Sequence, residues 1–206
     1  MCADFPLAIL AKAPLPGRVK TRLIPVLGAE GAVRLHERLL RRTLAIALAT
    51  TRPARITLWT ALDHAHPLFL ELAEQHGIML RPQPAGDLGV RMHHALQAMD
   101  QPGLLIGSDC PVLRPTLLWQ CREALSRVDA VFLPAEDGGY VLVGVRQADR
   151  RLFASIAWGT NRVMAQTRDR ARELGWWLSC PATLWDVDRP EDLDRLSGYS
   201  DGIAIT

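Results

Sequence analysis

The chain has 206 residues, of which 24 are Lys or Arg and 22 are Asp or Glu, so its formal net charge is +2. Hydrophobic residues make up 49% of the sequence and charged residues 22%, which excludes a collagen-like, disordered or polyanion-binding chain. A chain of this length buries about 70% of its extended surface on folding, enough for one core without disulfide staples. We therefore expect a single domain over residues 1–206.

The four cysteines and the apolar runs indicate the cellular compartment of such a domain. Cys2, Cys110, Cys121 and Cys180 form no CxxC pair and show no zinc-ligand spacing, so we expect small apolar residues in a reducing compartment. No apolar run approaches the roughly 18 residues that a membrane span needs, and the stretch 5–11 lacks a basic leader. We expect a cytoplasmic protein without a membrane or nucleic-acid partner, because the net charge is small and aromatic residues make up only 6%.

Strand and helix signals alternate along the chain. Bounded apolar runs predict strands near 6–11, 55–60, 78–81, 103–107, 129–133, 140–145 and 177–185. Apolar residues at spacings of three and four predict a long helix near 29–50, with shorter helices near 66–76, 87–99, 115–126, 161–174 and 190–197. Strands separated by helices need crossover connections, so the predicted fold is α/β, with a mainly parallel sheet covered on both faces.

One connection departs from this pattern. The segment PAEDGG between the strands near 129–133 and 140–145 is too short for a helical crossover, so these strands are predicted to form a hairpin or to change sheet. Ligands of open α/β sheets bind beyond the carboxyl ends of the strands. The segments that follow strands are therefore the places to look for chemistry.

The segment LAKAPLPGRVKTRL follows the first strand and holds both lysines of the chain, Lys12 and Lys20, whereas the other 22 basic residues are arginines. Its two prolines and its glycine favour a stiff, non-helical loop from which basic side chains project. Such a cluster suits a diphosphate or triphosphate; the alternative is a solvated basic turn. The candidate phosphate-binding residues are Lys12, Pro14, Gly17, Arg18, Lys20, Thr21 and Arg22.

Two familiar phosphate-binding motifs do not fit this loop. The string GRVKT ends in Lys and Thr as a Walker loop does, but the upstream glycine that four residues should separate from Gly17 is absent. A GxGxxG dinucleotide fingerprint is also missing.

The segment IGSDCPVL presents Ser108 and Asp109 where an apolar strand ends. A carboxylate at the carboxyl edge of a central strand is desolvated on one side and needs a cation, which Mg²⁺ or Mn²⁺ supplies. Asp109 is the first candidate for a metal ligand and Ser108 for a substrate contact. The alternative for Asp109 is a helix cap, which Pro111 and Pro115 disfavour because they delay the next helix.

The segment WDVDRPEDL follows the last predicted strand and places Asp186 and Asp188 on the same side of an extended backbone. Two carboxylates that close are costly unless a cation lies between them, so both are candidate metal ligands. Asp188 stands immediately before Arg189 and Pro190, and its alternative is a helix cap.

Two glycine-containing segments complete the candidates. In PAGDLGVRM, Asp87 precedes a predicted helix whose amide end can face a nucleotide, with Arg91 one turn further on. In PAEDGGYVLVG, the candidates for an acceptor-binding edge are Asp137, Gly138 and Gly139, and the alternative is a simple turn. The adjacent pair His93 and His94 is predicted to pack or lie on the surface, because neighbouring helical positions diverge.

Six segments, taken together and in order, resemble bacterial glycosyltransferase-A superfamily proteins known as nucleotide-diphospho-sugar transferases. They are LAKAPLPGRVKTRL, GDLGVRM, IGSDCPVL, PAEDGGYVLVG, WGT and DVDRPEDL. The resemblance spans nearly the whole chain and implies a single-domain Rossmann-like fold, a divalent metal and a nucleotide across the ends of the first strands. It also implies a nucleotide-binding half at about 1–110 and an acceptor half at about 111–206.

A second resemblance bears on the reaction. Many glycosyltransferases of this fold carry an Asp-x-Asp motif, whereas Asp109 stands alone, as in nucleotidyltransferases such as molybdenum cofactor guanylyltransferase and phospholactate guanylyltransferase. Arg189 also stands where related sequences have a small hydroxyl residue.

The leading hypothesis is a Mg²⁺- or Mn²⁺-dependent glycosyltransferase that moves a sugar from a nucleoside diphosphate sugar to a small acceptor, with Lys20, Asp109 and Asp188 as catalytic residues. One alternative is a nucleotidyltransferase that joins a nucleoside triphosphate to a phosphorylated acceptor and releases pyrophosphate. Another is a nucleotide-binding protein without turnover. The sequence carries no pattern that predicts the base, the sugar, the acceptor or the oligomeric state.

Overall fold

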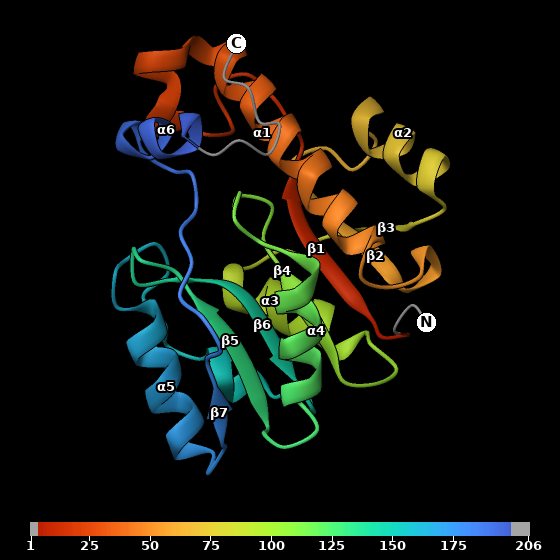
Figure 1. Cartoon of the computed structure of the whole chain (residues 1–206), viewed down its shortest axis with the longest axis vertical. Helices are drawn as coiled ribbons and strands as arrows, with labels where there is room; N and C mark the ends of the chain where they lie inside the picture. The colour runs from red at the N-terminus through yellow and green to blue at the C-terminus, as the bar shows by residue number, and fades with distance from the viewer. Residues whose placement is uncertain (1–3, 199–206) are drawn as a thin grey trace.

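A seven-stranded sheet runs through the centre of the computed structural model, which describes residues 4–198 (Figure 1). Its strands are β1 (Leu7–Lys12), β2 (Ile56–Ala61), β3 (Met79–Pro82), β4 (Gly103–Ile106), β5 (Ala130–Pro134), β6 (Tyr140–Val145) and β7 (Leu178–Ser179). They lie in the order β3-β2-β1-β4-β6-β5-β7, and among them only β6 runs antiparallel to its neighbours. The predicted mainly parallel sheet is confirmed, and β5 and β6 form the predicted hairpin.

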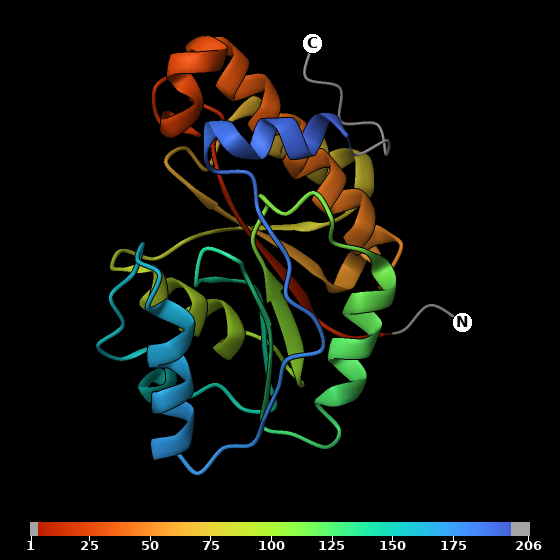
Figure 2. The ribbon, with the colours of Figure 1, turned by 60° about the vertical axis from the view of Figure 1, so that its left-hand side comes forward.

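Helices cover both faces of this sheet, as the sequence predicts (Figure 2). They are α1 (Ile24–Leu48), α2 (Pro67–His76), α3 (Leu88–Gln97), α4 (Pro115–Ala124), α5 (Val163–Glu173) and α6 (Pro190–Ser197), with 3-10 turns η1 (Thr21–Leu23), η2 (Pro53–Arg55) and η3 (Arg150–Phe153). Apolar side chains of α1, α2 and α4 pack on one face, and those of α3, α5 and η3 pack on the other. The result is a three-layer α/β fold.

The central strands are apolar on both faces because neither face meets water. In β1, Leu7 and Ile9 pack into the layer under α1, whereas Ala8 between them packs into the layer under α3. Alternate side chains of a strand point to opposite faces, so a strand buried on both sides reads as a continuous apolar run. All residues of β4 and β5 are buried accordingly.

Two predicted elements differ from the structure. The strand predicted at 177–185 is reduced to β7 and a single parallel bridge between Leu184 and Ala135, because Pro181 has no backbone N–H to donate to a ladder. The helix predicted at 29–50 begins earlier, with α1, and is kinked at Gly28, whose φ of +69° is not helical. Pro25 at the start of α1 fits the first turn of a helix because its missing N–H has no partner there.

Helix α6 brings the end of the described chain back to its beginning. Leu193 and Leu196 of α6 pack with Leu35 and Leu39 of α1, and Val187 in the segment before α6 is fully buried among them. Figure 1 shows α6 beside the N-terminal half of α1, and in Figure 2 the two helices cross. This contact fixes residues 186–189 beside the loop that follows β1.

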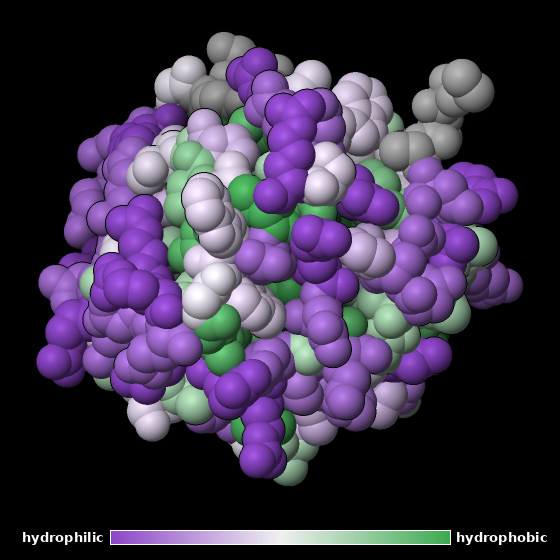
Figure 3. All heavy atoms as spheres, turned by 90° about the horizontal axis from the view of Figure 1, so that it is seen from below, coloured by the Kyte–Doolittle hydropathy of each residue, from purple (hydrophilic) through white to green (hydrophobic). Residues whose placement is uncertain are grey.

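No helix within residues 4–198 combines the length and the apolar character that crossing a bilayer requires. Cys110 and Cys121 are buried, Cys180 is exposed, and all three are free thiols, whereas Cys2 lies outside the described residues. On the face drawn in Figure 3, hydrophilic side chains surround small, separate apolar areas. Most apolar side chains on this side of the molecule therefore lie in the core.

Candidate active site

A cavity of about 490 Å³ opens at the carboxyl ends of β1 and β4, the edge where the fold predicts a ligand. Its wall combines the loop after β1, the end of β4, the first turns of α3, part of β6 and the segment before α6. The predicted site residues on this wall are Lys12, Arg18, Lys20, Thr21, Arg22, Arg91, Ser108, Asp109 and Asp188. Segments that are far apart in the sequence thus meet around one space.

Lys20 is the buried cation of this wall. Its Nζ lies 2.8 Å from Oδ1 of Asp109 and donates a hydrogen bond to the carbonyl of Val187, and only 4% of its side chain is exposed. Its backbone is left-handed, with φ of +48° and ψ of +39°, a conformation that residues other than Gly, Asn and Asp seldom adopt. The turn holds this strain because the ammonium is fixed by partners from two distant segments.

Asp109 remains ionised in this setting. Its Oδ1 is out of contact with solvent, whereas 44% of the side chain as a whole is exposed and lines the cavity. Burial raises the pKa of this carboxyl, but the charge of Lys20, the charge that His36 carries when protonated in acid, and the hydrogen bond from Lys20 outweigh it and hold the pKa below its usual value. The carboxylate therefore presents a negative charge at the edge of the cavity.

His36 supports the same corner from α1, and sequence reasoning missed it. Its Nε2 lies 2.9 Å from the carbonyl of Lys12, and its Nδ1 lies 3.9 Å from Oδ1 of Asp109. Burial lowers the pKa of His36 more than the nearby Asp109 raises it, so the ring is neutral at pH 7 and Nε2 donates to Lys12. The available signal was a lone imidazole among the apolar residues on the buried side of the helix predicted at 29–50.

Asp188 enters the cavity from the segment before α6 and forms an ion pair with Arg22 of the opposite wall. The N–H of Val187 donates to the carbonyl of Asp109 at 3.0 Å, which ties this segment to the end of β4. The alternative that Asp188 caps α6 is wrong: the N-cap is Arg189, and Oδ2 of Asp192 accepts the N–H groups of Asp188 and Arg189 at 2.9 and 2.7 Å. The carboxylate of Asp188 is thereby left to face the cavity.

Gln83, just after β3, was also missed. Its Nε2 donates to the carbonyls of Ala11 and Trp59 at 3.2 and 2.8 Å, and its Oε1 accepts from Nη1 of Arg91 at 3.5 Å. Nε of Arg91 in turn donates to the carbonyl of Gly86 at 3.1 Å. The position beyond a predicted parallel strand was the signal that could have found Gln83.

Other predicted site residues hold the backbone and do not line this cavity. Asp87 caps α3, with its Oδ1 accepting from the N–H of Val90 at 2.9 Å. Gly138 has φ of +91°, and a Cβ there would come within 2.1 Å of the carbonyl oxygen of Asn161. Gly139 closes a turn by donating to Asp137, Gly17 occupies an exposed turn with φ of +75°, and Pro14 is buried beneath the loop.

Asp137 and Asp186 line a second cavity of about 390 Å³, which shares Arg22 and Asp188 with the first. Burial, followed by the negative charges of Asp137 and Asp109, raises the pKa of Asp186 to about 6. The charges of Asp137 and Asp109 thus lie close enough to Asp186 to act on its carboxyl.

The acidic residues of the first cavity fit a divalent cation that is held partly by substrate. Within residues 4–198, no three His, Cys, Asp or Glu side chains gather closely enough to form a metal site by themselves. Mg²⁺, however, is commonly bound by one or two carboxylates together with substrate phosphates and water. Asp109 and Asp188, carboxylates on the wall of one cavity, are that kind of donor set.

A mainly parallel sheet with helices on both faces and a cavity across the ends of β1 and β4 defines the class of the protein as the nucleotide-diphospho-sugar transferase fold. A protein from Desulfovibrio desulfuricans G20 that carries the provisional name nucleotide-diphospho-sugar transferase superimposes with a TM-score of 0.84 at 28% identity, over 95% of this chain and 87% of that chain. The chain itself belongs to the family described as "uncharacterized protein conserved in bacteria (DUF2064)", which matches residues 43–160.

More distant structures share the fold alone. A nucleotidyl transferase from Methanothermobacter matches with a TM-score of 0.62 at 15% identity, over 96% of this chain and 98% of that chain. Rv0371c from Mycobacterium tuberculosis, solved in complex with manganese, matches with a TM-score of 0.54 at 14% identity, over 94% of this chain and 98% of that chain. No functionally curated protein matches the sequence.

Proposed function

We propose that this protein transfers a glycosyl group from a nucleoside diphosphate sugar to a small acceptor, with the help of Mg²⁺ or Mn²⁺. The observation that carries the proposal is the meeting of Lys20 and Asp109 at 2.8 Å on the wall of a cavity of about 490 Å³. A buried ammonium suits a phosphate oxygen, and an ionised carboxylate beside it suits a divalent cation. A diphosphate joined to a metal ion satisfies both.

The residues of the loop after β1 would bind the diphosphate. Lys12, Lys20 and Arg22 bring three positive charges to one side of the cavity, and Arg18 and Thr21 line the same wall. Asp109 and Asp188 would hold the divalent cation, which when bound supplies positive charge against the diphosphate leaving group. Lys20 and Arg22 would stabilise the same developing charge from the other side.

The remaining wall would hold the nucleoside. Leu10, Leu88 and Met92 offer apolar surface for a flat base, and Arg91 lies among them with its guanidinium held by Gln83 and Gly86. In this proposal residues 1–110 supply most of the nucleotide site and residues 111–206 supply the acceptor side. Asp188 and part of β6 are the exceptions, because they reach the wall of the first cavity from the acceptor half.

The chemistry requires no side-chain nucleophile. A hydroxyl group of the acceptor attacks the anomeric carbon of the donor, and a C–O bond forms as the bond from that carbon to the β-phosphate oxygen breaks. The nucleoside diphosphate leaves with the electron pair, and the hydroxyl proton passes to solvent. The chain contributes orientation and charge, which are the main terms in such a transfer.

A second candidate is nucleotidyl transfer, in which an acceptor phosphate attacks the α-phosphorus of a nucleoside triphosphate. The observation in its favour is the single Asp109 after β4, without a second acidic residue next to it. The same cations and carboxylates would bind a triphosphate, so the two reactions differ in the bond that breaks.

Product identity separates these reactions. The protein is incubated with Mg²⁺ or Mn²⁺, small-molecule acceptors, and panels of nucleotide sugars and nucleoside triphosphates. Release of nucleoside diphosphate, abolished in Asp109→Asn, is the expected result; release of pyrophosphate contradicts glycosyl transfer. Calorimetry on the same samples tests the third hypothesis, a nucleotide-binding protein without turnover. Nucleotide affinity that does not change with Mg²⁺ or Mn²⁺, together with no product, contradicts both enzyme hypotheses.

A further inference from the structure

The second cavity lies where an acceptor would have to bind. Its volume of about 390 Å³ falls within the usual range for small-molecule pockets, about 300 to 1,000 Å³. It shares Arg22 and Asp188 with the donor cavity, so the two spaces meet at these side chains. A molecule in the second cavity would therefore border the same Arg22–Asp188 ion pair as a donor bound in the first cavity.

The cations of this second cavity are largely neutralised by its own walls. Nη1 of Arg195 lies 2.7 Å from Glu136, and its guanidinium lies over the ring of Trp185 at 4.4 Å. Arg22 is paired with Asp188. Three guanidinium groups and five carboxylates line the cavity in all: Arg22, Arg189, Arg195, Glu136, Asp137, Asp186, Asp188 and Asp192.

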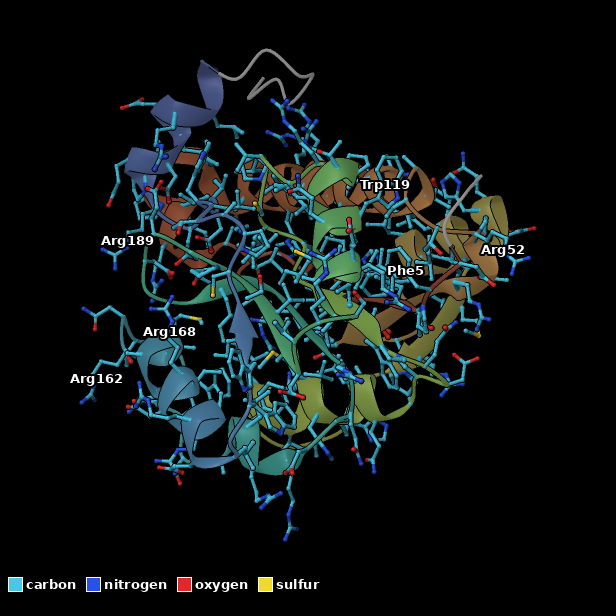
Figure 4. All side chains as sticks on the ribbon, turned by 60° about the horizontal axis from the view of Figure 1, so that its bottom comes forward. Phe5, Arg52, Trp119, Arg162, Arg168 and Arg189 are labelled. Atoms are coloured by element: carbon cyan, nitrogen blue, oxygen red, sulfur yellow. The ribbon has the colours of Figure 1, made fainter. Side chains whose placement is uncertain are left out.

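The unpaired charge that remains on the wall of this cavity is on balance negative. Oδ2 of Asp192 is occupied by two backbone N–H groups, and Oδ1 of Asp137 accepts one from Gly139. Asp137 and Asp186 have no arginine or lysine partner within residues 4–198. The third arginine, Arg189, also lines the cavity and is exposed, and Figure 4 shows its side chain extending away from the ribbon, so two unpaired carboxylates stand against one guanidinium.

We infer that the second cavity binds the acceptor and that the acceptor presents an uncharged hydroxyl group there, not a phosphate. This inference rests on the proposed function and narrows it to one acceptor class. A hydroxyl group donates to a carboxylate, so Asp137 and Asp186 are suitable partners, and the amide of Asn161 on the same wall adds both a donor and an acceptor. A phosphate group would meet like charge at both carboxylates.

Binding of the donor and a divalent cation in the first cavity does not reverse this preference for a hydroxyl group over a phosphate. A divalent cation adds two positive charges, and the diphosphate of a nucleotide sugar adds two negative charges. If Arg22 turns to the diphosphate, Asp188 turns to the cation, so Asp137 and Asp186 keep their excess of negative charge. These two carboxylates on the wall of the second cavity therefore face the acceptor in the loaded protein as well.

The test uses matched probes that differ only by a phosphate: glucose with glucose 6-phosphate, and glycerol with glycerol 3-phosphate. Binding is measured by ligand-observed NMR on the full chain loaded with Mg²⁺ and the nucleoside diphosphate that calorimetry finds to bind best. We expect at least one unphosphorylated probe to bind about tenfold or more tightly than its phosphorylated partner, the scale of one uncompensated like-charge contact.

Paired variants show whether Asp137 and Asp186 cause this preference. Asp137→Asn combined with Asp186→Asn removes both charges, and Asn at 137 can still accept from Gly139, so the preference should shrink severalfold. Asp169→Asn is the matched control, because Asp169 lies on α5 outside the cavity, paired with Arg172. It should leave the preference unchanged.

Three results overturn the inference: tighter binding of the phosphorylated probes, a preference that the double variant leaves intact, or no binding of any probe. Failure of the proposed function is recognised separately. If no nucleoside diphosphate binds in the calorimetric step, the donor assignment is wrong, whereas nucleotide binding together with preference for phosphorylated probes rejects the acceptor class alone.

Discussion

The ammonium of Lys20 and the carboxylate of Asp109 lie 2.8 Å apart, although one belongs to the loop after β1 and the other to the end of β4. Each charge stabilises the other, because a buried ammonium and a partly buried carboxylate are both destabilising when unpaired. The pair therefore joins two distant segments on the wall of the first cavity. Its removal is the most direct way to test the site.

Lys20→Ala is expected to weaken nucleotide binding by about 1 to 3 kcal/mol, the range for loss of a charge-assisted contact. Isothermal titration calorimetry with the preferred nucleoside diphosphate and Mg²⁺ measures the change. Arg172→Ala, which removes a charge from the exposed side of α5, is the control and should bind as the wild type does. Equal affinities for the two variants would remove Lys20 from the phosphate site.

Lys20→Gly separates the backbone of this residue from its charge. The φ of +48° is strained for alanine and relaxed for glycine, so Lys20→Gly should be more stable than Lys20→Ala by about 1 kcal/mol. Chemical denaturation of both variants gives the difference in free energy of unfolding. A more stable Lys20→Ala would show that the turn does not keep this conformation in solution.

Asp109→Asn should uncouple nucleotide binding from metal. In the wild type we expect Mg²⁺ to raise nucleotide affinity, and in the variant we expect this gain to fall by about tenfold or more, because the remaining amide oxygen is a weaker ligand than a carboxylate. Titrations with and without Mg²⁺ measure the gain in each protein. A gain of the same size in both proteins would place the metal elsewhere.

The buried His36 should make the protein less stable in mild acid. The pKa of His36 is lowered in the folded state, so below about pH 6.5 the unfolded chain binds a proton that folded His36 does not. The free energy of unfolding therefore decreases as the pH is lowered. In His36→Gln, which keeps a donor for the carbonyl of Lys12, the fall between pH 7 and pH 5 should be smaller. Thermal unfolding at several pH values compares the two, and parallel curves would contradict a depressed pKa.

Gly138→Ala should destabilise the β5–β6 connection by about 2 kcal/mol or more. The new methyl group meets both a φ of +91° and the carbonyl oxygen of Asn161 at 2.1 Å, so the turn or the start of α5 must move. Gly159→Ala is the matched control, because that glycine also has positive φ but nothing lies within 4 Å of the methyl group that alanine would add. The two variants should differ in melting temperature, with Gly138→Ala the lower.

The fold was predictable because local patterns decide it. Apolar runs on doubly buried strands, the stripe on α1 and the short PAEDGG connection each depend on neighbours in sequence. The prediction of a strand over 177–185 was wrong because it relied on apolar content and neglected Pro181, which cannot donate to a ladder. The predicted start of the long helix was too late, because Pro25 suits a first turn.

The site was predictable as a set of residues but not as an arrangement. Lys20, Asp109 and Asp188 follow from the rule that ligands lie beyond strand ends. His36 was not found because a lone histidine on an apolar stripe does not by itself indicate a functional site. Asp188 could not be told from a helix cap, because the sequence does not show that Asp192 accepts the N–H groups before α6. The second cavity depends on how α6 packs on α1, which is a long-range contact that spacing does not encode.

The packing of Leu193 and Leu196 on α1 also sets when the cavity can exist. During synthesis the loop after β1 leaves the ribosome well before Val187 and Asp188, so until the segment before α6 is made, the loop lacks this part of the cavity wall. The cavity is thus completed only when α6 has been made and has packed on α1.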